Sequence, residues 1–203
     1  MKVKLIHTKD DPVRLSFPNL FKPVAFKNAD GSSGNPRYDA TYIVKPDGAN
    51  AKRIREAIVA VARDKFGADK YEKVLKAISG NSNKMCYLDG DTKDYDGYEG
   101  MRFLACHRKE KDGPPFVCDQ NRNELSERSG KPYAGCYVNA TVDIYAQEGQ
   151  YQGIRAGIIG VQFVADGDAF GGSSRGSADD FDDLACEDGD GSSEDAGGAS
   201  DLF

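Results

Sequence analysis

Residues 133–147 read YAGCYVNATVDIYAQ, and apolar and polar side chains alternate along most of this stretch. Successive side chains of a β-strand point to opposite faces of the sheet, so the alternation predicts a strand with one face toward a core. One face would carry Cys136, Val138, Ala140, Val142 and Ile144, and the other Tyr137, Asn139, Thr141, Asp143 and Tyr145. This is the clearest strand of the chain, and it indicates a fold built mainly on β-structure.

A second regular strand is predicted earlier in the chain. Residues 37–45 read RYDATYIVK, and one face of this strand would carry Tyr38, Ala40, Tyr42 and Val44. Upstream, residues 13–26 predict a strand, a break at Pro18 and a second short strand, because proline lacks the N–H that a β-ladder needs. Residues 29–36 contain glycine, asparagine and proline, and they predict a loop.

The remaining strand signals are shorter and lie in the second half of the chain. Strands are predicted at 84–88, 101–108 and 116–118, with a last strand or bent pair at 154–164. The last one is rich in glycine, at Gly153, Gly157 and Gly160. Glycines at such positions indicate strong curvature or a close approach of another backbone segment.

Between these strands the hydrophobic period changes from two residues to three or four. Asp47 or Asn50 is expected to cap a first helix, and Gly67 to end it. The apolar residues that recur at helical spacing are Ile54, Ala57, Ile58 and Val61. A second helix is expected at 68–79, so a helical insertion covers about residues 47–80. Five to seven strands with one inserted helical pair predict a small barrel.

The last 38 residues differ in composition from the rest of the chain. Residues 166–203 hold 12 carboxylates against one base, a net charge of −11, so residues 1–165 carry +5 of the total of −6. A segment this charged buries too little apolar surface to offset the roughly 1–2 kcal/mol per residue of backbone entropy that ordering costs. We therefore expect a basic domain at 1–165 and a disordered acidic tail at 166–203.

The tail ends in an acidic residue followed by two large apolar ones, Asp201, Leu202 and Phe203. This ending predicts that the terminus binds a partner protein. A flexible segment of this length spans on the order of 35 Å, which is enough to fold back across a small domain. The tail is therefore also expected to compete for the basic surface of the body.

Several classes of function are disfavoured. No two of the five cysteines have the spacing of a zinc site, so reduced thiols are expected. No signal peptide and no run of about 20 apolar residues occurs, which favours the cytoplasm and no membrane contact. Cys106 and His107 are neighbours on a strand and point to opposite faces, so they cannot share a proton. Residues 89–100 lack the glycine and ligand spacing of a calcium loop. We expect no catalytic residue, no metal and no cofactor.

The body offers aromatic rings interleaved with basic residues on predicted strands. Single-stranded nucleic acid is bound in this way, because cations track the phosphates while rings stack on bases at about 1–3 kcal/mol each, without reading sequence. The predicted DNA contacts are Arg37, Tyr38, Tyr42, Lys45, Arg102, Phe103, Arg108, Lys131, Tyr133 and Tyr137. A tyrosine on a strand is also a common core residue, so the prediction depends on the whole arrangement.

Several stretches of the chain resemble a known family. They are residues 134–146 (AGCYVNATVDIYA), residues 160–172 (GVQFVADGDAFGG), the block 13–21 and the pair Lys45-Pro46. Together they resemble phage-type single-stranded-DNA-binding proteins, a family formerly classed as a domain of unknown function, over most of residues 1–172. The ending Asp201-Leu202-Phe203 is similar to the acidic, phenylalanine-terminated tails of bacterial and phage proteins of this kind. The resemblance implies an OB-fold barrel, non-catalytic binding of single-stranded DNA, and a role in phage replication or recombination. It assigns no base-contacting residue.

The leading hypothesis is a non-sequence-specific single-stranded-DNA-binding protein. It would combine an OB-like five-stranded barrel, extra strands, the helical insertion and the acidic tail. Its partners would be single-stranded DNA and, through the tail, phage or host replication or recombination proteins. Three alternatives stay open: a metal-dependent phage nuclease or annealing enzyme, an acidic DNA-mimic module whose body never meets DNA, and a structural phage protein.

Overall fold

A computed structural model of the chain describes residues 1–25, 33–149 and 152–171, which all belong to one compact unit. The predicted partner-binding residues Asp201, Leu202 and Phe203 lie outside the described residues. Among the described residues, no helix is long and apolar enough to cross a membrane.

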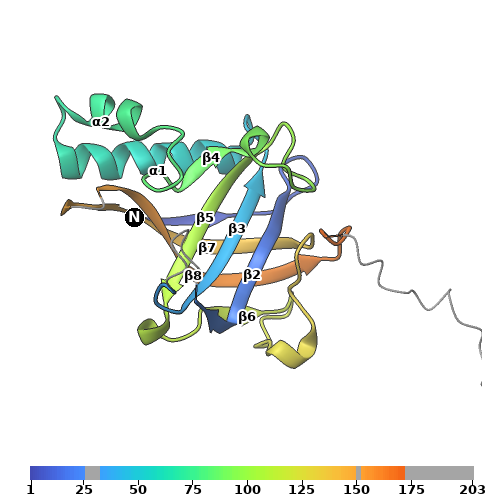
Figure 1. Cartoon of the computed structure of the whole chain (residues 1–203). Coiled ribbons are helices and arrows are strands. Elements are labelled where there is room, and N and C mark those ends of the chain that lie inside the picture. The colour runs from blue at the N-terminus through green and yellow to red at the C-terminus, as the bar shows by residue number, and fades with distance from the viewer. Residues whose placement is uncertain (26–32, 150–151, 172–203) are drawn as a thin grey trace, which may run out of the picture. The chain divides into compact units, whose positions relative to one another are not determined.

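The described part of the chain contains eight strands and two α-helices (Figure 1). The strands are β1 (Lys2–Leu5), β2 (Val13–Val24), β3 (Arg37–Val44), β4 (Tyr87–Asp89), β5 (Arg102–Lys109), β6 (Phe116–Cys118), β7 (Tyr137–Gln147) and β8 (Gly153–Ala165). The helices are α1 (Ala49–Phe66) and α2 (Tyr71–Ile78), which follow β3 and precede β4.

Five of the strands close into a barrel in the order β2–β3–β5–β8–β7. The ring closes because β7 pairs with β8 along its whole length and with β2 where Tyr137 faces Arg14. All neighbours in the ring are antiparallel except β5 and β8, which run parallel where His107 meets Gly157. Numbered in chain order, the five strands follow the order 1-2-3-5-4-1 of an OB barrel. The prediction of a mainly β, OB-like five-stranded barrel with an inserted helical pair is confirmed.

The extra strands widen the barrel wall. Strand β1 pairs with β7 at residues 140–143, beyond the point where β2 pairs with it. Strand β6 pairs with β8 in parallel, and β4 pairs with β5. Strand β1 was not predicted, because four residues are too few to show a periodic pattern. Its alternation becomes meaningful only in the pairing, where Val3 faces Val142 and Leu5 faces Ala140. Both β1 residues are buried.

The strand β2 also differs from the prediction. Pro18 does not divide it; the strand runs on, with register shifts against β3 after Ser16 and again after Asn19. The irregularity places Phe17 at φ 48°, a left-handed conformation that is uncommon outside glycine. A bulge of this kind absorbs the missing N–H of proline without ending the strand.

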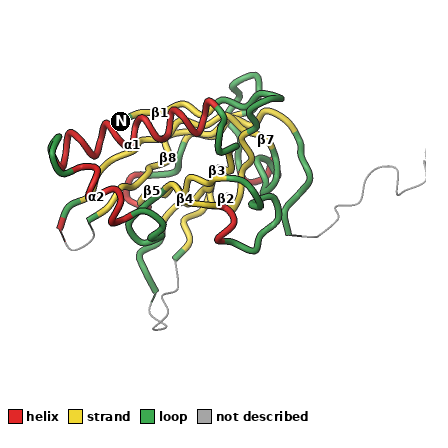
Figure 2. The backbone as a smooth tube through the Cα atoms, turned by 90° about the horizontal axis from the view of Figure 1, so that it is seen from above, coloured by secondary structure: helices red, strands yellow, loops and turns green. Residues whose placement is uncertain are grey.

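The helical pair lies together at one end of the barrel (Figures 1 and 2). The buried face of α1 is formed by Asn50, Ala51, Ile54, Ala57, Ile58 and Ala62, and the helix contacts β1 and β7. The predicted cap at Asp47 or Asn50 is wrong, because the cap residue is Gly48 and the acceptor comes from another segment. The Asp11 carboxylate accepts from the Asn50 N–H and from its side-chain amide, both at 2.8 Å.

The compact unit extends beyond the predicted boundary at residue 165. Tyr133 Oη lies 3.0 Å from Asp166 Oδ1 and also donates to the Gly167 carbonyl at 3.0 Å. Arg14 donates to the Asp168 carbonyl at 2.6 Å, and its guanidinium lies 4.2 Å from the centre of the Phe170 ring. The six residues 166–171 are therefore part of the domain rather than of the tail.

The cysteines of the described part are all free and buried, at Cys86, Cys106, Cys118 and Cys136. Burial raises the pKa of Cys86 to about 12 and that of Cys136 to about 11. For these four residues, the prediction of reduced thiols that pack as small apolar side chains is confirmed.

Candidate nucleic-acid interface

A groove of about 1000 Å³ opens on the outer face of β3 and β5, beside the end of β7. We call it the main groove; it is lined by Gly34, Asn35, Pro36, Arg37, His107, Lys109, Glu110, Lys111, Tyr145, Ala146, Gln147 and Glu148. The lining joins the second and third barrel strands to the β2–β3 and β7–β8 connections. In OB barrels these are the surfaces that bind oligonucleotides.

The cations of the main groove are brought together by strand register. Arg37 of β3 faces Lys109 of β5. Two residues further along β3, Asp39 faces His107, so all four side chains lie on one face of the sheet. Arg37 Nε lies 2.8 Å from Asp39 Oδ1. Burial raises the pKa of the Asp39 carboxyl, while the nearby Arg37 opposes that shift. Lys111 lies just beyond β5 and adds a further cation to the lining.

Two rings lie on the floor of the main groove. Tyr145 Oη and His107 Nε2 are 3.4 Å apart, at hydrogen-bonding distance, which ties β7 to β5 across the intervening β8. Between them lies Gly157, where an added Cβ would stand 3.7 Å from the His107 carbonyl oxygen and 4.0 Å from Tyr145 Cε1. Glycine at this position therefore leaves the space beside the Tyr145 ring open.

His107 carries no charge at neutral pH. Burial is the main cause that lowers its pKa to about 4, and the positive charges of Arg37, Arg155 and Lys109 lower it further. The imidazole therefore contributes a flat ring and a hydrogen-bonding nitrogen to the groove, and the positive charge comes from arginine and lysine.

The rim of the main groove is not uniformly basic. Glu110 and Glu148 also line it, and Glu148 forms an ion pair with Lys65 of α1 at 3.1 Å. An exposed pair of this kind contributes little to stability. The arrangement of cations around neutral rings is suited to holding phosphates and stacking bases.

Three predicted stacking residues are buried. Tyr38 is 6 % exposed, Tyr42 is fully buried, and Phe103 is 5 % exposed. The prediction that they stack on bases is wrong for this structure, because a base cannot reach a ring inside the barrel wall. Tyr38 and Tyr42 share the face of β3 that carries Ala40 and Val44, and this apolar face points inward.

Three predicted cations hold neighbouring segments instead of entering the main groove. Lys45 Nζ donates to the Asp10 carbonyl at 2.7 Å. Arg102 pairs with Asp89 at 3.0 Å. Arg108 donates to two carbonyl oxygens of the β5–β6 turn, at 2.6 and 2.8 Å. Each of these side chains fastens a loop to the barrel.

The remaining predicted residues gather at the 166–171 segment, away from the main groove. Lys131 Nζ lies 2.9 Å from Asp166 Oδ2, beside the Tyr133 hydroxyl. The Tyr137 ring lies 4.6 Å from the His7 ring and 5.6 Å from the Arg14 guanidinium. Of the ten predicted contacts, only Arg37 lines the main groove.

Sequence reasoning missed most of the main groove. Tyr145 lies on the predicted polar face of its strand, and Lys109 and Lys111 directly follow the predicted strand 101–108. No local pattern distinguishes these residues from other exposed ones. Knowledge of the OB strand order would have found them, because it places the second and third strands beside the connection between the fourth and fifth.

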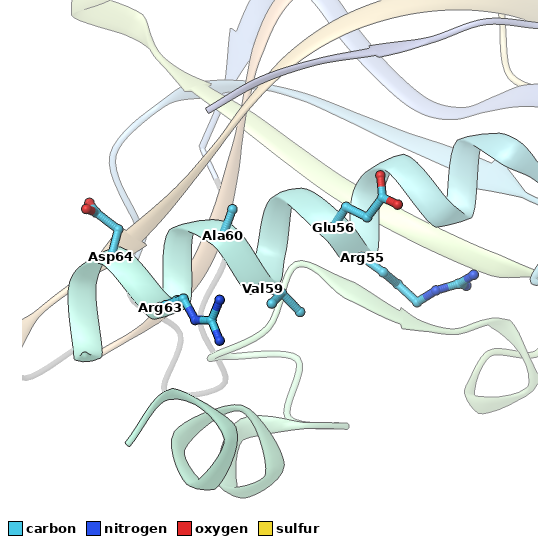
Figure 3. Close-up of a pocket in the computed structure, with 6 residues that line it drawn as sticks. All are labelled: Arg55, Glu56, Val59, Ala60, Arg63 and Asp64. Atoms are coloured by element: carbon cyan, nitrogen blue, oxygen red, sulfur yellow. The ribbon is translucent and has the colours of Figure 1, made fainter. Parts of the chain in front are cut away.

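A hollow of about 650 Å³ also lies on the surface of α1. Figure 3 shows Arg55, Val59 and Arg63 on one side of the helix, and Glu56, Ala60 and Asp64 on the other. The Arg63 guanidinium already lies over the Tyr71 ring of α2, 5.2 Å from its centre. No convergent set of groups points into this hollow, and we interpret it as a solvated helix face.

The closed 1-2-3-5-4-1 barrel and the position of the main groove define the class of protein, an OB-fold oligonucleotide-binding barrel. The chain belongs to the family described as "Enterobacter phage Enc34, ssDNA-binding protein", whose model matches residues 3–192. The family is named for binding rather than for a catalysed reaction, which agrees with the prediction that the chain is not an enzyme.

Three individual phage proteins are similar to this chain. Protein p50 of Acyrthosiphon pisum secondary endosymbiont phage 1 is 38 % identical over 186 residues, which cover 91 % of this chain and 95 % of that protein. The single-stranded DNA-binding protein from bacteriophage Enc34 in complex with ssDNA is 28 % identical, with a TM-score of 0.64, over 84 % of this chain and 89 % of that one. The bacteriophage T7 protein gp2.5, 14 % identical with a TM-score of 0.50 over 95 % of this chain and 100 % of that one, shares the fold.

Proposed function

We propose that this chain binds single-stranded DNA in the main groove, without sequence preference, during phage DNA replication or recombination in the host cytoplasm. The observation that carries the proposal is the register of β3 and β5, which sets Arg37 beside Lys109. The His107 and Tyr145 rings lie beside these cations. A solved relative of the same family is a complex with single-stranded DNA.

The mechanism follows from the chemistry of the lining. Arg37, Lys109 and Lys111 neutralise phosphates, which gives affinity without sequence information. The Tyr145 ring stacks on a base, and Gly157 leaves room for that base above the floor. Because any base presents a flat face, the binding is tolerant of sequence.

The test replaces Tyr145 and Lys109 separately by alanine and measures fluorescence anisotropy of a labelled oligo-dT strand. We expect Tyr145→Ala to weaken binding by about 1–3 kcal/mol, the value of one stacked base. We expect Lys109→Ala to reduce the salt slope by about 0.7, the value of one phosphate contact on a single strand.

The matched control is Tyr71→Ala, a half-buried tyrosine on α2 that does not line the main groove. It should bind DNA like the wild type, and circular dichroism should show that all three variants are folded. Equal binding by wild type and Tyr145→Ala, with both folded, would exclude the main groove as the DNA site.

The acidic tail has two roles in this proposal. Its carboxylates occupy the basic surface of the body when DNA is absent, and DNA displaces them. Displacement frees Leu202 and Phe203 to bind replication or recombination proteins. The charge division between residues 1–171, at +3, and residues 172–203, at −9, supports the competition.

A further inference from the structure

A second groove, of about 490 Å³, lies on the outer face of β1, β7, β8 and β6. We call it the β6 groove; it is lined by Lys4, Leu5, Ile6, Phe116, Cys118, Arg122, Asn139, Ala140, Thr141, Gly160, Val161 and Gln162. The lining contains two cations and no carboxylate, which distinguishes it from the main groove. Figure 1 shows β6 at the end of the barrel away from α1 and α2.

Phe116 is the most unusual residue of the β6 groove. Its side chain is 52 % exposed, although it lies on a strand paired with β8, and the neighbouring Ile6 is 42 % exposed. In that pairing Phe116 faces Gly160, where an added Cβ would come within 3.2 Å of the Phe116 carbonyl oxygen and 3.7 Å of its Cβ. Glycine at this position keeps the surface beside Phe116 clear.

The two cations of the β6 groove are available to a ligand. Among the described residues, none accepts a hydrogen bond from, or forms an ion pair with, the side chain of Lys4 or Arg122. Arg122 has φ 68° and is held in this left-handed conformation by the turn that Asp119 builds. The Asp119 carboxylate accepts from Asn121 N–H and Asn123 N–H, both at 2.8 Å, so this carboxylate is bound within the turn.

The amide groups of the floor are already satisfied. Asn139 Nδ2 donates to Gln162 Oε1 at 3.0 Å, and Gln162 Nε2 donates to the Asp119 carbonyl at 3.2 Å. With its polar atoms paired, the floor has little to offer a ligand that must be read by specific hydrogen bonds. It suits one that is held by stacking and by charge.

The β6 groove and the main groove share the strand β7. Tyr145 of the main groove and Thr141 of the β6 groove lie on the same face of this strand, four residues apart. At about 3.3 Å per residue, the separation is about 13 Å. This separation is short enough for one DNA strand to span both grooves.

We propose that the β6 groove is a second contact site for single-stranded DNA, in which Phe116 stacks on a base while Lys4 and Arg122 bind the adjacent phosphates. This inference rests on the proposed function, and it adds a site outside the second and third barrel strands. The positive lining and the exposed ring favour a nucleic acid over an apolar peptide. An acidic protein segment carries the same sign of charge as DNA, and the experiment separates the two.

The experiment exploits the absence of tryptophan from this chain. Phe116→Trp places a single indole in the β6 groove of the full-length protein, and oligo-dT strands of increasing length are titrated into it. We expect quenching of the indole by long strands only, because a short strand fills the main groove first. The matched control is Tyr95→Trp, since Tyr95 is equally exposed, at 53 %, but lies between Asp94 and Asp96. Its fluorescence should not change.

Affinities of alanine variants complete the test. Phe116→Ala should weaken binding of long strands by about 5- to 10-fold and leave binding of the shortest strand unchanged. The double variant Lys4→Ala/Arg122→Ala should reduce the salt dependence of the affinity for long strands, by about 0.7 in slope per lost phosphate contact. The Phe116→Trp variant, which keeps a stacking ring, should retain wild-type affinity.

The outcomes separate this inference from the proposed function. If the wild type binds no strand of any length, the proposed function is wrong and the inference falls with it. If the wild type binds but Phe116→Ala matches it at every length, only the β6 site is overturned. Quenching of the Phe116→Trp indole by an acidic peptide with the sequence of residues 194–203, but not by DNA, would also overturn it and assign the groove to a protein segment.

Discussion

Single side chains set the chemistry of the main groove. His107 and Tyr145 are both aromatic and lie at hydrogen-bonding distance, yet only the surrounding cations give the groove positive charge. Because burial and neighbouring cations keep His107 neutral, DNA binding should not change with imidazole protonation between pH 6 and 8. The same residue affects stability at lower pH.

The pKa of His107 predicts acid sensitivity of the fold. The folded-state pKa, about 4, is below the ordinary value of 6.5, so the unfolded chain takes up the proton first as the pH falls. The contribution of the neutral ring is full above pH 6.5 and is lost between pH 6.5 and 4, on the order of 1–3 kcal/mol. Thermal unfolding at pH 7 and pH 4.5 should therefore show a smaller loss for His107→Gln than for the wild type.

The other histidine provides the control for this prediction. His7 is also buried in part, and burial lowers its pKa in the same direction. A His7→Gln variant should keep the larger part of the wild-type pH dependence. An identical loss in wild type and His107→Gln would show that His107 does not titrate with a shifted pKa.

At the scale of elements, close backbone approach explains the glycine-rich last strand. A segment before β4 lies against the start of β8, where Ile154 N–H donates to the Lys84 carbonyl at 2.8 Å. A Cβ added at Gly153 would stand 2.2 Å from that same carbonyl oxygen, which no side-chain movement can relieve. At Gly157 on the same strand, the nearest atom would be 3.7 Å away.

This difference predicts that the same substitution, glycine to alanine, destabilises the protein at one position and not at the other. Gly153→Ala should destabilise the protein by about 1–3 kcal/mol, because the backbone of one of the two segments must shift. Gly157→Ala should change the free energy of unfolding by less than about 0.5 kcal/mol, as surface substitutions do. Urea denaturation of both variants measures the difference, and equal stabilities would contradict the close approach.

The 166–171 segment shows how an element can be ordered without regular structure. Arg14 donates from Nε to the Gly135 carbonyl at 3.0 Å and from a second nitrogen to the Asp168 carbonyl at 2.6 Å. Two donors in a fixed fork are characteristic of arginine, and lysine cannot reproduce them. These contacts hold residues 166–171 against the barrel.

For the whole molecule, the main property is the division of charge. Removing residues 173–203 takes away ten carboxylates and one arginine, so the formal net charge changes from −6 to +3. If the tail competes with DNA, its deletion should tighten binding, and most strongly at low salt, where charges are least screened. Anisotropy measured at several salt concentrations, with and without the tail, tests this expectation.

Phe203→Ala separates the two proposed roles of the tail. It leaves every carboxylate side chain in place, so DNA affinity should change little, while binding of replication or recombination partners should be lost. Unchanged DNA affinity after deletion of residues 173–203 would argue against competition, and unchanged partner binding by Phe203→Ala would argue against the terminal anchor.

The elements of this protein were largely predictable because hydrophobic periodicity is a local property. The alternation in residues 37–45 and 133–147 identified two barrel strands and divided the side chains of each between two faces. The three- and four-residue period of α1 identified the inserted helix. The alternation does not say which face of residues 37–45 is buried, so Tyr38 and Tyr42 were predicted as stacking residues, and only the structure shows that they point inward.

The sequence by itself determined the β-rich class, the helical insertion, the acidic ending and the division of the strands into two faces, since each depends on neighbouring residues. Only the tertiary structure decided which polar side chains meet. Arg37, His107 and Tyr145 come from three separate strands, and barrel closure brings them to one groove. Phe116 and Lys4 line one groove in the same way, because the short strands that carry them, which have no period of their own, pair with β8 and β7. Such contacts depend on strand order and register, which no local pattern specifies.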